Sequence, residues 1–329
     1  MNKKFLALVL TSCLAGYLHA QDPHFSQFYA NPLYLNPAFA GSNGCSRANV
    51  IGRYQWPQLS GDYRTISASY DANIASIRGG LGLMILHDAA GQNTIATTRI
   101  SGIYSYELPV NENFTLRMAA EATYNNIRID KDKLYFGDQI HPRYGFIYPT
   151  SEVINNPSRG FLDIQAGILG YTDKLFFGFA VHHLTEPQQN FIPGPASKLP
   201  RKYTGHIGAI IPIGNTSYMV NERRDMISPN LMFKMQGQSM QINVGLYAQK
   251  GAIVGGLWYR NVSQDFASDA MIAMIGMYLD KFKIGYSYDF TISKLTNATS
   301  SGAHELSLGM NFNCVERGQS FRMLDCPAF

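Results

Sequence analysis

Two neighbouring histidines, His182 and His183, are the most suggestive sign of chemistry in this sequence. Imidazole nitrogens bind zinc and transfer protons near neutral pH. Successive side chains of a strand point to opposite faces, so a regular strand cannot direct both rings at one ion. The sequence around them lacks the clustered ligands of a metal site. We interpret the pair as hydrogen-bonded structural residues and predict no metal site.

Other candidate chemistry is equally sparse. The run "DKDKLYFGD" (130–138) alternates acidic residues but lacks the glycine at the sixth position of an EF-hand loop. His304 and Ser307 are three residues apart, which places them on opposite faces of a strand and not in a catalytic pair. Motifs for a nucleophilic serine, a phosphate loop or a zinc protease are missing from the sequence. We expect no enzymatic activity and no cofactor.

The composition favours a large β structure. Of 329 residues only 15% are charged, against about 25% in typical soluble proteins. Glycine and tyrosine are abundant, at 30 and 20 residues, and no apolar run approaches the length of a membrane helix, about 18 residues. These features fit a transmembrane β-barrel, with a large soluble β-sandwich as the alternative. The net charge of +4 is small and scattered, which argues against nucleic-acid binding.

The first twenty residues have the pattern of a secretion signal. A basic start at residues 2–4 precedes an apolar stretch, and "LHA" before Gln21 suits cleavage. A lipoprotein processing site at Cys13 is a competing interpretation. Export places the remaining cysteines, Cys45, Cys314 and Cys326, where disulfides form. Cys314 and Cys326 are the most local pair, and pairings with Cys45 stay open.

Alternating runs fill the chain from about residue 47. In "KIGYSYDFTI" the apolar face holds Ile284, Tyr286, Tyr288 and Phe290, while the opposite face holds glycine, serine, aspartate and threonine. A soluble sandwich would usually present Lys and Glu to water. Small polar residues instead suit the lumen of a membrane barrel, and the aromatic ends of the apolar faces suit its interfacial girdles.

Fourteen such runs predict an all-β fold, a transmembrane antiparallel barrel over residues 47–313. The even number is typical of bacterial barrels. The tight and long connections do not alternate regularly, so loop sidedness is open. Two long loops, 129–159 and 185–204, are expected to be functional. One strand, "AMIAMIGMYL", is apolar on both faces, which indicates that something packs against it from inside. The expected strands lie near 47–56, 62–72, 79–88, 95–107, 113–128, 160–172, 174–184, 202–213, 226–235, 239–248, 251–260, 269–280, 281–291 and 303–313.

The stretch "DPHFSQFYANPLYLNPAFAG" (22–41) precedes the first expected strand. Proline removes a backbone donor, so this segment cannot be a central strand, and its many aromatic residues are unusual for a disordered leader. We predict that residues 21–46 form a plug or lining segment in the lumen. The residues of this expected plug motif are Asn31, Pro32, Asn36, Pro37, Ala38 and Gly41.

These residues, together with motifs spread over the chain, resemble the PorP/SprF family of Bacteroidetes outer-membrane proteins. The resemblance rests on residues 21–41 and on "RYQWPQL" (53–59), "SASYD" (67–71), "GGLGLMILHDAAG" (79–91), "LYFGDQI" (134–140), "VHHLTEP" (181–187), "LPRKYTGHIGA" (199–209), "LWYR" (257–260), "GYSYDFTIS" (285–293), "HELSL" (304–308) and "CPAF" (326–329). It implies a fourteen-stranded barrel of the type IX secretion system, which is linked to gliding motility. The element Asn36-Pro37-Ala38 matches a luminal element of related transporter barrels.

The resemblance also implies partners. Such barrels are thought to serve large secreted cargo, adhesin-type proteins with a type IX C-terminal domain, and to support export or cell-surface anchoring beside other secretion components. The alternative is a plugged channel for hydrophobic or small solutes. A tail at 314–329 would be pinned by a Cys314–Cys326 disulfide. Aromatic residues in long loops often dominate binding, so the expected cargo contacts are Tyr135, Phe136, Tyr144, Phe146, Phe191 and Ile192.

Overall fold

The computed structural model describes residues 22–59, 61–152, 156–189, 191, 198–213, 225–262, 268–293 and 297–312. The expected signal peptide, the alternative at Cys13, and the tail at 314–329 with Cys314 and Cys326 lie outside these residues. Ile192 also lies outside them.

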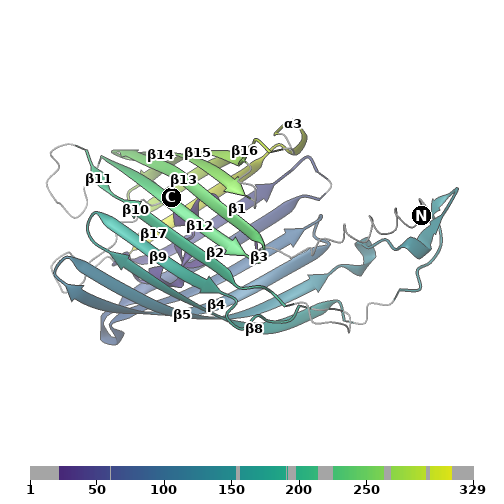
Figure 1. The fold of residues 1–329 in the computed structure, drawn as a ribbon, viewed down its shortest axis with the longest axis horizontal. Coiled ribbons are helices and arrows are strands. Elements are labelled where there is room, and N and C mark those ends of the chain that lie inside the picture. The colour runs from purple at the N-terminus through teal and green to yellow at the C-terminus, as the bar shows by residue number, and fades with distance from the viewer. Residues whose placement is uncertain are drawn as a thin grey trace, which may run out of the picture.

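Fourteen long strands form one closed antiparallel barrel (Figure 1). Each strand pairs with the next along the chain; pairing of β1 with β17 and of β10 with β12 completes the ring. The predicted fold class is therefore confirmed. The strands are β1 (Ser46–Gln55), β2 (Tyr63–Ile74), β3 (Gly79–Ala90), β4 (Ile95–Asn111), β5 (Phe114–Ile129), β8 (Ser158–Tyr171), β9 (Leu175–His182), β10 (Lys202–Ala209), β12 (Met226–Gln236), β13 (Ser239–Lys250), β14 (Ile253–Val262), β15 (Ser268–Leu279), β16 (Phe282–Thr291) and β17 (Ala303–Phe312).

The wall is inverted relative to a soluble protein: apolar side chains point outward and polar ones inward. In β17, Leu306 and Leu308 are exposed, whereas Glu305 and Ser307, which alternate with them, are buried. Most strands follow the same pattern, although several also turn apolar side chains inward, such as Leu86 of β3 and Ile272 of β15. An exposed apolar band around a polar interior is the arrangement that a lipid bilayer stabilises. The alternation that predicted the strands thus also predicted which face meets lipid.

The two ends of the barrel differ. One end, here called the turn end, carries the short connections at 75–78, 112–113, 172–174, 251–252 and 280–281, together with the start of β1 and the end of β17. The opposite end, here called the loop end, carries the connections at 130–157 and 183–201. Short turns face the periplasm and long loops the exterior in outer-membrane barrels, so the loop end is the outer one.

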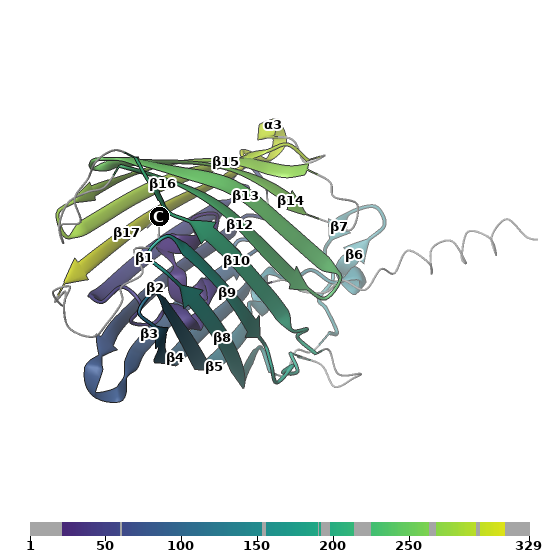
Figure 2. The ribbon, with the colours of Figure 1, turned by 60° about the vertical axis from the view of Figure 1, so that its left-hand side comes forward.

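The irregular alternation of loop lengths has a simple origin. The tight connection after β1 belongs to the loop end, and the longer connection between β10 and β12, which includes β11 (Ile211–Pro212), belongs to the turn end. The two loops singled out from the sequence leave the wall at the same end. The first of them contains the small hairpin of β6 (Ile140–His141) and β7 (Gly145–Phe146), which lies beyond the ends of the wall strands (Figure 2).

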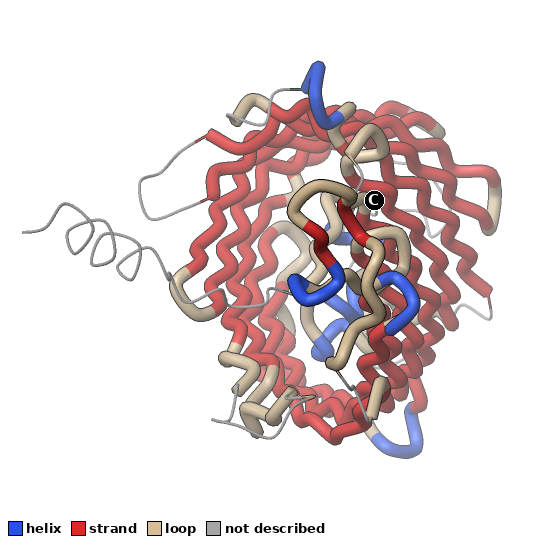
Figure 3. The backbone as a smooth tube through the Cα atoms, turned by 90° about the vertical axis from the view of Figure 1, so that its right-hand side faces the viewer, coloured by secondary structure: helices blue, strands red, loops and turns tan. Residues whose placement is uncertain are grey.

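Helices are few and short. They are η1 (Phe28–Ala30), α2 (Pro32–Leu35), η2 (Pro37–Phe39), η3 (Ala75–Ile77), η4 (Lys131–Lys133), η5 (Gly137–Gln139) and α3 (Asn297–Ser300). In the parts of the chain that the structure describes, no helix is long and apolar enough to cross a membrane. The first three helices belong to residues 22–45, here called the inner segment, and lie within the ring of strands (Figure 3).

A charge on the outer face of the wall tests this orientation. Ile85 lies midway along β3 and is 53% exposed, and Ile140 in β6 of the outer loop is 48% exposed. We expect Ile85→Lys to lower the free energy of unfolding in lipid vesicles by about 2–4 kcal/mol, because a lysine at mid-membrane depth is costly. The matched change Ile140→Lys should cost little. Equal costs, measured by urea titration, would contradict a lipid-facing wall at Ile85.

Candidate functional site

The inner segment runs along the lumen from the loop end to the turn end. Its start, Asp22, contacts residues near the loop-end termini of β4, β9 and β10. Its end is at the turn end, where Gly41 contacts Asp71 near the end of β2 and Cys45 precedes β1. The interior of the barrel is therefore occupied over much of its length by the chain itself.

Asp22 anchors the loop-end part of the inner segment. Its carboxylate accepts hydrogen bonds from Arg99 Nη2 at 2.6 Å and Lys202 Nζ at 2.7 Å, and contacts His183 Nε2 at 2.8 Å. Burial alone would raise the pKa of Asp22, but the positive charge of Arg99, supported by His183 and Lys202, holds this pKa well below its ordinary value. Asp22 is thus a buried anion that links strands widely separated in the sequence.

The histidine pair belongs to this anchor. β9 ends at His182, and His183 has a φ of 59°, so its backbone leaves the regular strand. Both rings are buried as a result, His182 against Gln165 and His183 between Asp163 and Asp22. The expectation that the two rings point to opposite faces is wrong, because the strand ends between them. Their hydrogen-bonded surroundings agree with a structural role for both.

A second anchor joins the inner segment to the seam where β1 meets β17. The backbone amides of Ser26 and Gln27 donate to the Glu305 carboxylate at 2.6 and 2.9 Å. The Ser26 hydroxyl donates to Asp289 at 2.7 Å, and Arg53 forms ion pairs with both of these carboxylates. Backbone amides of the segment therefore complete the hydrogen bonding of Glu305, a buried carboxylate of the wall that also pairs with Arg53.

Arg260 of β14 extends this second anchor. It forms ion pairs with Asp289 at 2.8 Å and with Asp269 at 2.6 Å. His24 of the inner segment lies near it. Burial and the neighbouring charges of Arg53 and Arg260 hold the pKa of His24 well below its ordinary value, so its ring is neutral at pH 7.

The expected plug-motif residues are all buried in the structure. Asn36 caps η2: its Oδ1 accepts from the Ala38 amide at 2.9 Å, while its Nδ2 donates to the carbonyl of Ile168 in β8, also at 2.9 Å. Pro37 stands at the first position of η2, where a missing amide costs nothing. Within the inner segment, short helical turns and their caps thus include Asn31, Pro32, Asn36, Pro37 and Ala38, and Gly41 lies in the turn that follows η2.

Aromatic packing fills the space between the inner segment and the wall. Phe28 meets Trp258 edge to face at 5.0 Å between ring centroids, and Tyr29 meets Phe176 at 5.7 Å. Such pairs add about 0.5–1.5 kcal/mol each to the burial of their area. Ile272 of β15 belongs to the same buried cluster. The strand that is apolar on both faces therefore does pack against an internal segment.

Close backbone contacts complete the anchoring at the turn end. The Gly41 amide donates to Asp71 at 2.8 Å, and Arg47 pairs with the same carboxylate at 2.9 Å. The Gly41 carbonyl accepts from Arg117, which is fully buried and also pairs with Glu107 at 2.7 Å. The next anchor along the chain is covalent, since Cys45 is disulfide-bonded; the other cysteines lie outside the described residues.

The expected cargo contacts lie at the loop end but differ in exposure. Tyr135, Tyr144 and Phe146 are 71%, 65% and 56% exposed. Phe136 and Phe191 are half-buried. Within the described ranges, no cluster of three or more His, Cys, Asp or Glu side chains is arranged to hold a metal ion.

Residues 18–310 match the family described as type IX secretion system membrane protein PorP/SprF. The chain belongs to this family. It is thus a β-barrel of the outer membrane, as its lipid-facing wall requires. No curated protein matches the chain.

Solved structures share the architecture at low sequence identity. The toluene transporter TbuX of Ralstonia pickettii is 10% identical and has a TM-score of 0.52, with 87% of this chain and 95% of that chain covered. A mutant of the monoaromatic hydrocarbon channel TodX is also 10% identical, with a TM-score of 0.48 and coverages of 85% and 94%. At 10% sequence identity, the similarity to TbuX establishes a shared barrel fold and nothing about function.

Sequence reasoning singled out residues 21–46 as a segment outside the strands but missed the charged side chains that contact it. Arg99, Lys202, Arg53, Asp289 and Glu305 stood in the alternating runs as isolated charges on polar faces. Their placement on the luminal face was a usable signal, because a buried charge needs an opposite charge or hydrogen bonds. Which charges meet depends on the register and order of the strands.

The Asp22 anchor has a testable pH dependence. We expect Asp22→Asn to lower the free energy of unfolding at pH 7 by about 3–5 kcal/mol, because Arg99 and Lys202 keep their buried charges without the carboxylate. The folded-state pKa of Asp22 is lowered, so its contribution is present above about pH 4 and is lost as the pH falls through the folded pKa. The difference between wild type and variant should therefore narrow in acid.

Urea titration at pH 7 and pH 3, with chymotrypsin cleavage after Phe25 or Phe28 as a second readout, measures this effect. Asp280→Asn, at an exposed turn between β15 and β16, is the matched control and should change neither quantity. A difference between wild type and Asp22→Asn that persists unchanged at pH 3 would contradict the ionic role of Asp22.

Glycine positions test how closely the inner segment fits the wall. A Cβ added at Gly80 of β3 would lie 2.2 Å from the Ala40 carbonyl oxygen and 2.7 Å from Gly41 Cα, whereas one at Gly102 of β4 would meet nothing within 4 Å. We expect Gly80→Ala to lower the thermal unfolding midpoint and increase protease cleavage of the inner segment, at a cost of about 1–3 kcal/mol. Gly102→Ala should be neutral, and similar effects for both would count against this close fit.

Proposed function

We propose that this barrel binds one large secreted cargo protein at its loop end, through the type IX C-terminal domain of the cargo, and supports its export or cell-surface anchoring. Membership of the type IX secretion family supports an assignment to that machinery, alongside its other components. The inner segment acts as a plug in this proposal, because it lies in the lumen and contacts the wall near both ends of the barrel.

The observation that carries the proposal is the exposed aromatic surface of the 130–157 loop. Residues 135–151 of this loop contact one another: Tyr135 and Phe146 pack ring to ring at 5.0 Å, and Asp138 accepts hydrogen bonds from Thr150 and Ser151. Tyr135, Tyr144 and Phe146 nevertheless remain mostly exposed. Rigid, exposed aromatic side chains are typical anchors of protein interfaces.

A second function, a plugged channel for hydrophobic or small solutes, is supported by the barrel architecture shared with TbuX, which is described as a toluene transporter. The two functions differ in whether solutes pass through the lumen. A cargo partner needs no flux through it, whereas a channel must let the inner segment shift. Conductance in planar bilayers separates them: a sealed wild-type barrel supports cargo binding, and sustained solute flux favours the channel.

An affinity pull-down from gently solubilised outer membranes tests the leading proposal. We expect one large secreted protein to co-purify with the wild-type barrel in near-equal amount. In the triple variant Tyr135→Ser, Tyr144→Ser and Phe146→Ser, the amount of this protein should fall at least about tenfold, since hot-spot aromatics each contribute about 2 kcal/mol or more. The measurement is mass spectrometry of the eluate, normalised to the barrel.

The matched control replaces non-aromatic exposed residues of the same loop, Pro142, Pro149 and Glu152, with serine. It should retain the cargo. Heat-modifiable mobility on gels verifies that each variant is folded. A partnerless wild-type barrel, or undiminished cargo with the aromatic variant, would reject the proposed docking surface.

A further inference from the structure

Strand β8 has a strand neighbour along its whole length on one side only. All of its residues, Ser158–Tyr171, pair with β5. On the other side, its neighbour β9 pairs only with residues 166–171 (Figure 1). In the part of the chain that the structure describes, residues 158–163 therefore have no strand on that side. They lie at the loop end and are here called the open edge.

The histidine pair sets the point at which β9 stops. β9 ends at His182, and the φ of 59° at His183 turns the backbone out of the strand. The His183 ring is held on both sides, by Asp163 of β8 at 2.6 Å and by Asp22 of the inner segment at 2.8 Å. Buried side-chain contacts thus fix the end of β9, and with it the length of the open edge.

The connection that follows β9 leaves the open edge uncovered. The Leu184 amide donates to the Ile164 carbonyl at 3.0 Å, which is the last backbone hydrogen bond to β8 among the described residues of this connection. The chain then pairs with itself, since the Leu199 amide donates to the Pro187 carbonyl at 2.9 Å.

The open edge presents backbone donors and acceptors. The Pro157 carbonyl accepts from the Ile129 amide of β5, whereas the Ile164 carbonyl accepts from the opposite side. Backbone groups alternate between the two sides of an antiparallel strand, so the N–H and C=O groups of Gly160 and Leu162 point away from β5. Within the described ranges, no strand pairing or backbone hydrogen bond engages them on that side.

The outer face of the open edge is apolar. Leu162 is 72% exposed, more than any other large apolar side chain of the described residues. Beside it, the Tyr124 side chain covers Gly160, because a Cβ added at Gly160 would lie 2.3 Å from Tyr124 Oη. Unpaired backbone groups next to exposed apolar side chains form a template for pairing with an extended polypeptide.

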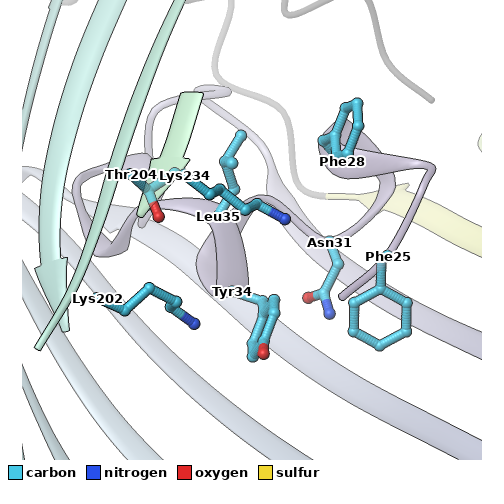
Figure 4. Close-up of a pocket in the computed structure, with 8 residues that line it drawn as sticks. All are labelled: Phe25, Phe28, Asn31, Tyr34, Leu35, Lys202, Thr204 and Lys234. Atoms are coloured by element: carbon cyan, nitrogen blue, oxygen red, sulfur yellow. The ribbon is translucent and has the colours of Figure 1, made fainter. Parts of the chain in front are cut away.

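The neighbouring part of the lumen offers a polypeptide no room. The cavity between the inner segment and strands β10 and β12 has a volume of about 10 Å³, about the space of one water molecule (Figure 4). Tyr34 of the inner segment and Lys202 of β10, the strand next to β9, are among its lining residues. This packing favours pairing at the rim of the barrel over entry into the lumen.

We infer that the open edge binds an extended segment of the secreted cargo as an added β-strand, in the place that β9 would occupy if it continued beyond His182. The identity of the partner rests on the proposed function. The open edge directly follows the 130–157 loop with its exposed aromatic side chains, and both lie at the outer end of the barrel. A peptide backbone is the ligand whose donors and acceptors match those of Gly160 and Leu162.

Photocrosslinking in cells identifies what covers the open edge. A benzophenone amino acid in place of Leu162 should link to one segment of a secreted protein, mapped by mass spectrometry of the linked peptide. The same amino acid in place of Leu257 of β14, which is 66% exposed, is the matched control and should not. Linkage from position 162 only to residues 190–197 of the same chain, to a second barrel or to lipid would overturn the inference.

Two substitutions at Leu162 separate backbone pairing from side-chain contact. Leu162→Pro removes the outward N–H but none of the pairing with β5, because proline is tolerated where the N–H faces away from the sheet. We expect the co-purified cargo to fall at least about tenfold, since main-chain hydrogen bonds supply the affinity in this mode of recognition. Leu162→Ala keeps the backbone and should retain most of the cargo. Heat-modifiable mobility verifies that both variants are folded.

The outcomes distinguish this inference from the proposed docking surface. Cargo lost in Leu162→Pro but kept in the aromatic triple variant supports the open edge and rejects the aromatic surface. Cargo kept in Leu162→Pro, or lost equally in Leu162→Pro and Leu162→Ala, overturns the inference and leaves the aromatic surface standing. A wild-type barrel without any secreted partner rejects both.

Discussion

The polar interior of the wall is the constraint on which the rest of the structure depends. A bilayer stabilises the strands only if their apolar faces point outward, so the charged and amide side chains of the same strands must point inward. Those groups then need partners in a confined space. Arg53, Asp289, Glu305 and Arg117 find them partly in one another and partly in the backbone of the inner segment.

This arrangement explains why the inner segment is irregular. A strand would pair its amides and carbonyls with a neighbouring strand, and a long helix would pair them within itself. Short turns separated by proline leave the amides of Ser26, Gln27 and Gly41 free to donate to wall carboxylates, and the carbonyl of Gly41 free to accept from Arg117. The aromatic residues between these polar contacts bury apolar area against the apolar side chains that the wall turns into the lumen, such as Ile272. Polar anchoring and apolar packing thus alternate along the segment.

The inner segment occupies much of the lumen, and this directs attention to the outer surface. The side chains with charge inside the barrel are mostly engaged with one another or with the inner segment, whereas the 130–157 loop presents aromatic side chains outward. The loop is held to the wall through Asp130, whose amide donates to the Thr94 carbonyl at 2.8 Å, and through Lys133. For the proposed docking role, contacts that already hold residues 135–151 together would reduce the ordering required on binding.

The sequence by itself determined the wall. Alternation with period two gave all fourteen strands to within a few residues, since the bilayer imposes that period on every strand. Small polar residues on one face indicated a lumen, and Asn-Pro steps with aromatics indicated a non-strand segment before β1. These signals are local, because side-chain alternation along a strand and the missing backbone donor of proline depend only on residues close in the sequence.

Only the tertiary structure decided which distant groups meet. Asp22 and Lys202 are 180 positions apart, and their contact follows from barrel closure and strand register. The burial of both His182 and His183 follows from the end of β9 and a left-handed backbone at His183, which no period reveals. The sidedness of the loops likewise needed the strand order. Pairwise contacts across a closed barrel depend on the whole ring, so a one-dimensional pattern cannot specify them.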